Sequence, residues 1–245
     1  MTSAIQTREI QYTAADGSQL IGYFAAPQNA SAVAGVIVAP EWWGRNSYTE
    51  QRARELAEQG YAAFAIDMYG NKNVTTDAQQ ANTWMTATFA QADTIDIRSK
   101  AALDTLAAQP EVDASRLAAI GFCYGGKVVL DLARSGADVK AVTTFHANLS
   151  PKSPAEKGKV KAELLVLHGE LDSMVSLDDV AKFKAEMFAA DVTHEVIVFE
   201  NAKHGFSNPQ ADERAQANGV DLGYNAEAEQ RSLAAMYELL ARHLN

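Results

Sequence analysis

The sequence predicts an α/β fold with a mainly parallel central sheet that is flanked by helices on both faces. Short, almost continuously apolar runs alternate with longer segments of helical pattern, and such runs are typical of strands that are covered on both sides. Alternation of this kind forms a parallel sheet, because each helix carries the chain back to the start of the next strand. No break in composition, charge run or linker divides the 245 residues, so we expect residues 1–245 to form one domain.

The expected strands begin with an antiparallel hairpin. Residues 8–14 and 19–27 are strand-like and are separated by the turn-rich sequence Ala-Asp-Gly-Ser. The later apolar runs, which are expected to form the parallel part of the sheet, are residues 34–40, 61–67, 116–122, 140–146, 162–169 and 194–200.

Helical patterns fill the gaps between these strands. Residues 47–50 read Ser-Tyr-Thr-Glu, a capping-box signature, at the start of a helix that we expect to run to Gly60. Residues 176–179 read Ser-Leu-Asp-Asp and are expected to begin the helix before Asp191 in a similar way. In the last segment, apolar side chains recur at i, i+3, i+4 and i+7, which predicts an amphipathic helix packed on the core. These side chains are Leu233, Met236, Tyr237 and Leu240.

Composition excludes several classes of function. A formal net charge of −10 disfavours nucleic-acid binding, since phosphate backbones would be repelled. The apolar runs are shorter than the roughly 18 residues that a membrane-spanning helix needs, so no membrane association is expected. The polar start resembles no secretory signal, and the single cysteine forbids an internal disulfide; both favour a cytoplasmic location.

The strongest chemical signal is the sequence Gly121-Phe-Cys123-Tyr-Gly125, which lies between an expected strand and an expected helix. This is the nucleophile elbow, G-x-S-x-G, with cysteine in the serine position. Glycine is needed on both sides because the turn is too tight for side chains there. The sulfur would stand at a helix N-terminus, which favours a thiolate, and the amide of Tyr124 could donate to an oxyanion. A free cysteine is otherwise most often a buried, inert residue.

An elbow predicts an acid and a histidine later in the chain, in that order. Asp172 follows the strand 162–169, and His204 follows the strand 194–200. In this arrangement His204 takes the thiol proton, and Asp172 orients the imidazole and stabilises its cation. His168 precedes every plausible acid and is interpreted as structural, whereas His146 ends a strand and could line the pocket.

The loop Pro-Glu41-Trp42-Trp43-Gly follows the strand 34–40. Proteins with an elbow place their second oxyanion donor in this loop, here the backbone amide of Trp42. Glu41 would then lie beside the thiol, although a glutamate in a loop is usually solvated. Aromatic side chains could form an apolar pocket or could belong to the core. Those considered for the pocket are Trp42, Trp43, Trp84 and Phe206.

Four of these segments, PEWWG, GFCYGG, HGELD and NAKHGF, together resemble the dienelactone hydrolase family of α/β-hydrolases over essentially the whole chain. The resemblance implies a single-domain α/β-hydrolase fold, a triad of Cys123, Asp172 and His204, and no metal or organic cofactor. It also implies that Glu41 interacts with the thiol and helps to activate it.

The chain lacks arginines with which some family members bind the carboxylate of their substrate. Family members that hydrolyse dienelactone hold its carboxylate with arginines, one of them shortly after the catalytic histidine. Here the residues after His204 read Gly-Phe-Ser-Asn-Pro, and the expected position after Asp67 also lacks an arginine. The basic side chains left to compensate are Lys72, Lys203, Arg45 and Arg214.

The sequence therefore predicts a hydrolase of small-molecule carboxylic esters or lactones that forms a thioester on Cys123. Two alternatives stay open: an acyltransferase that uses the same thioester, and a non-catalytic binding module with a redox-sensitive thiol. Neither the physiological substrate nor the oligomeric state can be read from the sequence.

Overall fold

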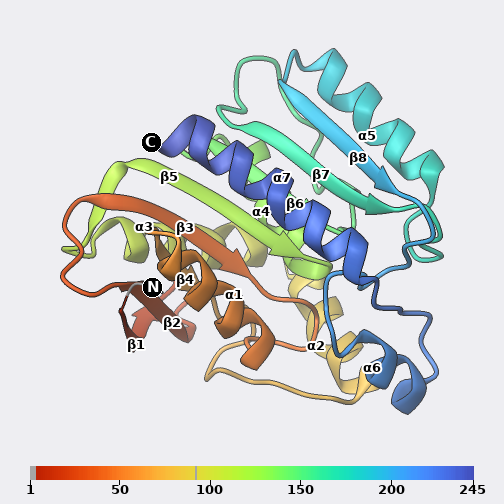
Figure 1. Ribbon diagram of the computed structural model, residues 1–245, viewed down its shortest axis with the longest axis horizontal. Helices are drawn as coiled ribbons and strands as arrows, with labels where there is room; N and C mark the ends of the chain where they lie inside the picture. Colours follow the sequence, from red (N-terminus) through yellow and green to blue (C-terminus); the bar gives the residue numbers. More distant parts are fainter. Residues whose placement is uncertain (1–3, 92) are drawn as a thin grey trace.

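The computed structural model describes residues 4–91 and 93–245, and within them a sheet of eight strands is surrounded by seven helices (Figure 1). The strands are β1 (Ile5–Thr13), β2 (Gln19–Pro27), β3 (Val33–Ala39), β4 (Ala62–Ala65), β5 (Val112–Phe122), β6 (Ala141–Phe145), β7 (Glu163–Gly169) and β8 (His194–Phe199). The helices are α1 (Ser47–Glu58), α2 (Ala78–Ala90), α3 (Thr94–Ala107), α4 (Tyr124–Arg134), α5 (Leu177–Ala189), α6 (Ala211–Asn218) and α7 (Ala226–Leu244).

The sheet has the order β1-β2-β4-β3-β5-β6-β7-β8. Strands β3 to β8 are all parallel to one another, whereas β1 pairs with β2, and β2 with β4, in antiparallel fashion. This confirms the predicted α/β class with its mainly parallel sheet and opening hairpin. The carboxyl ends of the parallel strands consequently lie at one edge, where such sheets bind their ligands.

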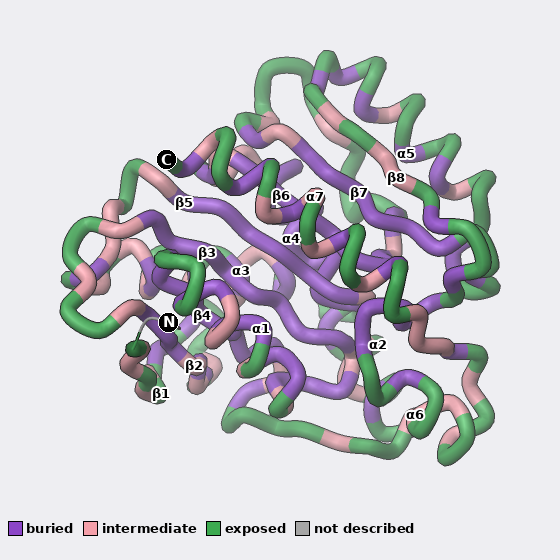
Figure 2. The backbone as a smooth tube through the Cα atoms, in the orientation of Figure 1, coloured by how far each residue is buried: buried purple, intermediate pink, exposed green. Residues whose placement is uncertain are grey.

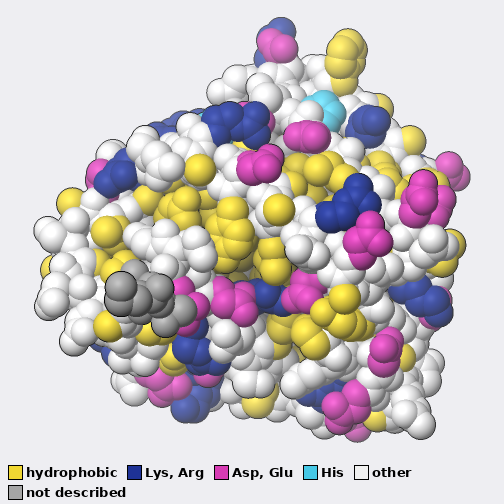
Figure 3. Space-filling view, viewed as in Figure 1, with side chains coloured by type: hydrophobic (Ala, Val, Ile, Leu, Met, Phe, Trp, Pro, Cys, Tyr) yellow, Lys and Arg dark blue, Asp and Glu magenta, His cyan; other side chains and the backbone are white. Residues whose placement is uncertain are grey.

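Helices cover both faces of the sheet. Apolar residues of α1 and α7 pack in one core cluster, and those of α3, α4 and α5 pack in another. The predicted stripe on the last helix faces the first cluster, where Met236 and Leu240 are fully buried. In Figure 2 the central strands are accordingly buried along most of their length. Figure 3 shows acidic and basic side chains interspersed on the face that carries α1 and α7.

Within the described residues, none of the helices combines the length and the apolar character required to cross a bilayer.

Capping signatures predicted the starts of two helices, and both helices begin there, but one capping box does not form. Ser176 caps helix α5, and its side chain and that of Asp179 form the expected capping box. Helix α1 is instead capped by Asn46, whose side chain accepts hydrogen bonds from the amides of residues 48 and 49. Asparagine caps as well as serine does, and the side chain of Glu50 pairs with Arg45 rather than with the cap.

Strand β5 is longer than its apolar run, which starts at residue 116. It begins at Val112, which pairs with Val33, and the register shifts between Ala34 and Gly35 before regular pairing resumes. The added residues 112–115 include polar, partly exposed side chains, so hydrophobicity alone could not reveal them.

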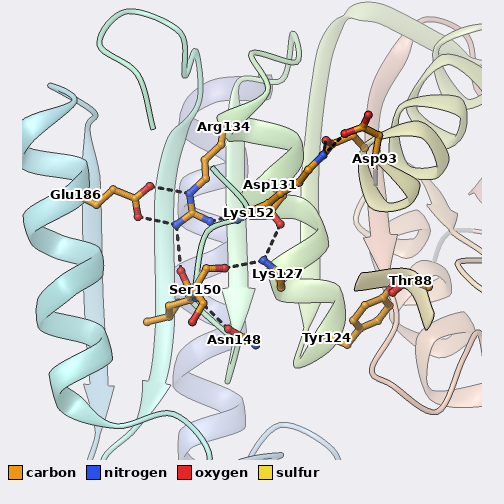
Figure 4. A network of polar contacts seen from close by, with 12 residues as sticks. Thr88, Asp93, Tyr124, Lys127, Asp131, Arg134, Asn148, Ser150, Lys152 and Glu186 are labelled. Atoms are coloured by element: carbon orange, nitrogen blue, oxygen red, sulfur yellow. Dashed lines mark hydrogen bonds and ion pairs between the residues drawn. The ribbon is translucent and has the colours of Figure 1, made fainter. Parts of the chain in front are cut away.

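A buried network of charges connects α4 to the loop after β6 (Figure 4). The carboxylate of Asp131 bonds to Lys127 Nζ at 2.8 Å and to Arg134 Nη1 at 3.1 Å. Lys127 also donates to the carbonyl of Ser150 at 2.6 Å, and Arg134 to that of Leu149 at 3.1 Å. These bonds hold the backbone of the loop after β6 in place. The first part of this loop lies beside the elbow.

Replacing Asp131 with asparagine should leave two buried cations without their shared anion, which costs about 3–5 kcal/mol of unfolding free energy. Denaturant titration measures this loss. The matched control is Asp138→Asn, which removes an exposed carboxylate paired with Lys140 and should cost less than about 1 kcal/mol. Equal losses in the two variants would show that the network does not stabilise the fold.

Candidate active site

The backbone at Cys123 has φ 52° and ψ −113°, between the end of β5 and the start of α4. A Cβ on Gly121 would lie 2.1 Å from the carbonyl oxygen of Gly125, and a Cβ on Gly125 would lie 2.3 Å from that of Ala39. Neither glycine can therefore carry a side chain. Positive φ at a non-glycine residue costs about 1–3 kcal/mol and persists where the surroundings enforce it. The turn leaves Cys123 partly exposed at the wall of a cavity.

Asp172 lies in the loop between β7 and α5 and is buried. Its Oδ1 atom accepts hydrogen bonds from the amides of Met174 and Val175, both at 2.9 Å. These two bonds fix the orientation of the carboxylate and therefore the position of its other oxygen. That oxygen, Oδ2, lies 2.8 Å from Nδ1 of His204.

His204 lies in the loop after β8, and backbone contacts join this loop to that of Asp172. The amide of Leu171 donates to the carbonyl of Ala202 at 2.9 Å, and a Cβ on Gly169 would lie 2.4 Å from the same oxygen. The Nε2 atom of His204 is buried and has no hydrogen-bond partner among the described residues. It belongs to the wall of the cavity that also contains Cys123.

The charge environment favours a protonated His204. Burial alone would lower its pKa, but the neighbouring Cys123 sulfur and the hydrogen bond with Asp172 outweigh burial and raise the pKa well above its usual value. An imidazole placed in this way can take the proton of the thiol and return it later.

Glu41, in the loop after β3, is 5% exposed and lines the same cavity. Burial raises the pKa of its carboxyl to about 7, although a hydrogen bond from Asn208 and the charge of His204 oppose the shift. The amide nitrogen of Asn208 lies 2.7 Å from Glu41 Oε2. Its oxygen accepts from the amide of Gln210 at 2.9 Å, so the nitrogen must face the carboxylate. Sequence reasoning missed this partner, because no local pattern connects positions 167 residues apart.

The two candidate oxyanion donors are placed on this cavity. Trp42 and Tyr124 both contribute to its wall. Within residues 4–91 and 93–245, the amide of neither residue donates a hydrogen bond to another group. The hydroxyl of Tyr69, which the sequence did not single out, donates to the carbonyl of Trp42 at 2.9 Å and so holds this peptide in place.

The cavity has a volume of about 170 Å³. Its wall consists of Glu41, Trp42, Trp43, Met85, Phe89, Cys123, Tyr124, Asn148, Met174, Val175, His204 and Leu222. Of the aromatic candidates for the pocket, Trp43 lies in this wall, whereas Trp84 and Phe206 do not. Trp84 packs against Tyr69 outside the cavity, and Phe206 is fully buried against Phe199 in the core.

The other histidines near the site are buried. His146 packs against the His204 ring at 5.1 Å, and its Nε2 atom lies 2.9 Å from the hydroxyl of Ser207. It does not line the cavity, and burial lowers its pKa well below the usual value. His168 is also buried, and burial likewise lowers its pKa. Both side chains are therefore expected to stay neutral.

Residues 20–244 match the model of the dienelactone hydrolase family. The chain belongs to this family. Two solved structures share the fold almost completely. One, named m3DLH, is 39% identical, with a TM-score of 0.93, and the match covers 99% of this chain and 100% of that one. The other is a dienelactone hydrolase-like promiscuous phosphotriesterase from metagenomic libraries, 36% identical with a TM-score of 0.92 and the same coverage.

A sequence relative from Salmonella typhimurium, named "Putative carboxymethylenebutenolidase", is 28% identical over 203 residues. The match covers 78% of this chain and 74% of the relative. Family membership and these relatives identify the protein as an ester-bond hydrolase with the α/β-hydrolase fold.

The raised pKa of Glu41 has a consequence for stability. In the unfolded chain this carboxyl loses its proton near pH 4.3, whereas in the folded protein it keeps the proton up to about pH 7. Below the pKa of the unfolded chain, the Glu41 carboxyl therefore makes its full favourable contribution to the free energy of unfolding. This contribution is lost as the pH rises to the pKa of the folded protein. Glu41→Gln keeps an acceptor for Asn208 but cannot ionise. Relative to the natural protein, this variant should gain about 2 kcal/mol of unfolding free energy between pH 5 and pH 8.

Denaturant titrations at the two pH values measure this difference. Glu58→Gln, which changes an exposed carboxylate at the end of α1, is the control and should show a constant difference. A constant difference for Glu41→Gln as well would contradict the raised pKa.

Proposed function

We propose that the protein hydrolyses carboxylic esters or lactones through a thioester on Cys123, with His204 and Asp172 completing a triad. The observation that carries this proposal is the placement of His204. Its Nδ1 atom is bound to Asp172, and its Nε2 atom has no hydrogen-bond partner in residues 4–91 and 93–245; the residue lies in a cavity wall that also contains Cys123 of the elbow.

In the first half of the reaction, the thiol gives its proton to Nε2 of His204, and the resulting thiolate of Cys123 bonds to the carbonyl carbon. The negative charge that develops on the carbonyl oxygen would be bound by the amides of Trp42 and Tyr124, the latter at the N-terminus of α4. When the carbon–oxygen bond breaks, the alcohol leaves with the proton from His204. A thiolate is itself readily expelled, so esters with good leaving groups suit this nucleophile.

In the second half, His204 takes a proton from water as the water oxygen attacks the thioester. The carbon–sulfur bond then breaks, the acid is released and Cys123 regains its proton. Asp172 holds the imidazole in one tautomer throughout and stabilises its cation. Glu41, held by Asn208, is the further carboxylate beside the thiol, and its resemblance to the family's glutamate supports a part in thiol activation.

Cys123→Ala should abolish hydrolysis, and it should also abolish the acyl adduct that intact mass spectrometry detects after brief exposure to 4-nitrophenyl acetate. The chain has a single cysteine, so any thioester adduct on the natural protein maps to this position. Cys123→Ser is the companion variant, because it keeps a nucleophile but changes its chemistry. A hydrolysis rate unchanged in Cys123→Ala would refute the mechanism.

Asp172→Asn should lower kcat/KM by roughly 10³–10⁴-fold, because the amide favours the wrong imidazole tautomer. Steady-state kinetics on an aryl ester measure the loss. Asp104→Asn is the control: this exposed carboxylate on α3 pairs with Lys100, and its loss should change kcat/KM less than about twofold. If the two variants behave alike, Asp172 does not orient the base.

A further inference from the structure

The wall of the cavity is mostly apolar, and its mouth is apolar too. Phe89 at the end of α2 and Met174 in the Asp172 loop are 40% and 46% exposed, and both line the cavity. Deeper in the wall lie Trp42, Trp43 and Leu222. Contact between such surfaces and an apolar group of the substrate removes apolar area from water, so the cavity favours apolar acyl or alcohol groups.

Acidic groups outnumber basic groups at the site. Glu41 and Cys123 line the cavity, and Asp172 lies directly behind His204. His204 is the only cationic side chain in the wall that the described residues form, and it already faces two of these acidic groups. A substrate carboxylate would therefore approach a site in which the one positive charge is already compensated.

None of the basic residues that could replace the family's arginines lines the cavity within the described residues. Arg45 is buried and paired with Glu9 and Glu50, and Lys72 is also paired with Glu9. Lys203 is bound to Asp221 at 2.7 Å.

Arg214 is placed over the ring of Trp43, with 5.3 Å between Cζ and the ring centroid, and its charge acts on Glu41. Asn208, close after the catalytic histidine, presents a neutral amide that is committed to Glu41. Each cation near the site is thus either paired or outside the cavity.

We propose that this site takes neutral esters with apolar acyl and alcohol groups and that it discriminates against esters carrying a free carboxylate. The discrimination comes from the Glu41 carboxylate in an apolar wall. A like charge held a few ångströms away in a partly desolvated site costs enough to lower affinity by tenfold or more. This inference rests on the proposed function, because it assumes that the ester reacts at Cys123.

The test uses two substrates that differ in charge but hardly in size: mono(4-nitrophenyl) glutarate, which has a free carboxylate, and its methyl ester. Release of 4-nitrophenolate reports the same bond in both. At pH 8 we expect kcat/KM for the methyl ester to exceed that for the free acid by about tenfold or more. Equal values, or a preference for the acid, would overturn the proposed substrate class.

Variants test the electrostatic origin of the preference, with the ratio of the two kcat/KM values taken within each variant. Met174→Lys adds a cation at the exposed mouth and should reduce the ratio, whereas the matched neutral variant Met174→Gln should not. Glu41→Gln should also reduce it, whatever its effect on the overall rate. Unchanged ratios in both Met174→Lys and Glu41→Gln would contradict the electrostatic account.

Cys123→Ala separates the two proposals, since release of 4-nitrophenolate that persists in this variant would refute the mechanism rather than the substrate class.

Discussion

The left-handed backbone at Cys123 is the constraint on which the rest of the site depends. Close contacts around Gly121 and Gly125 leave the turn no space to relax, so the sulfur is held at the end of β5. The loops after β3, β7 and β8 reach this point because their strands are parallel and end at one edge of the sheet. Backbone bonds between the last two loops then keep the Asp172 carboxylate against His204.

Much of this arrangement could be predicted because its signals are local. The tight turn requires glycines at fixed distances from the nucleophile, and these are visible as Gly121 and Gly125. Asp172 and His204 each follow a strongly apolar strand, so strand order alone placed them at the same edge. All eight strands were likewise expected. The six later strands were recognisable because buried parallel strands are almost continuously apolar, and the first two because a turn-rich sequence separates them.

Other features depend on contacts that no local pattern shows. Asn208 and Glu41 are 167 residues apart in the chain, and the sequence offers no sign of their bond. Trp84 was a candidate for the pocket, but its ring packs against Tyr69 instead. Aromatic residues suit both pockets and cores, so the sequence could not decide its place. The sequence could not show that Asn46 caps α1. Asn46 and Ser47 are adjacent and are both good capping residues, so residue type alone does not choose between them.

The central claim, that the imidazole of His204 acts on the thiol of Cys123, is tested most directly by the rate of alkylation of the single cysteine. Iodoacetamide reacts with the thiolate, so the rate at pH 6 reports how far the imidazole has taken the proton. If the imidazole takes the thiol proton, the natural protein should react with iodoacetamide at pH 6 at least about tenfold faster than His204→Ala does. Equal rates in the two proteins would contradict it, because the thiol and the imidazole would then be chemically independent.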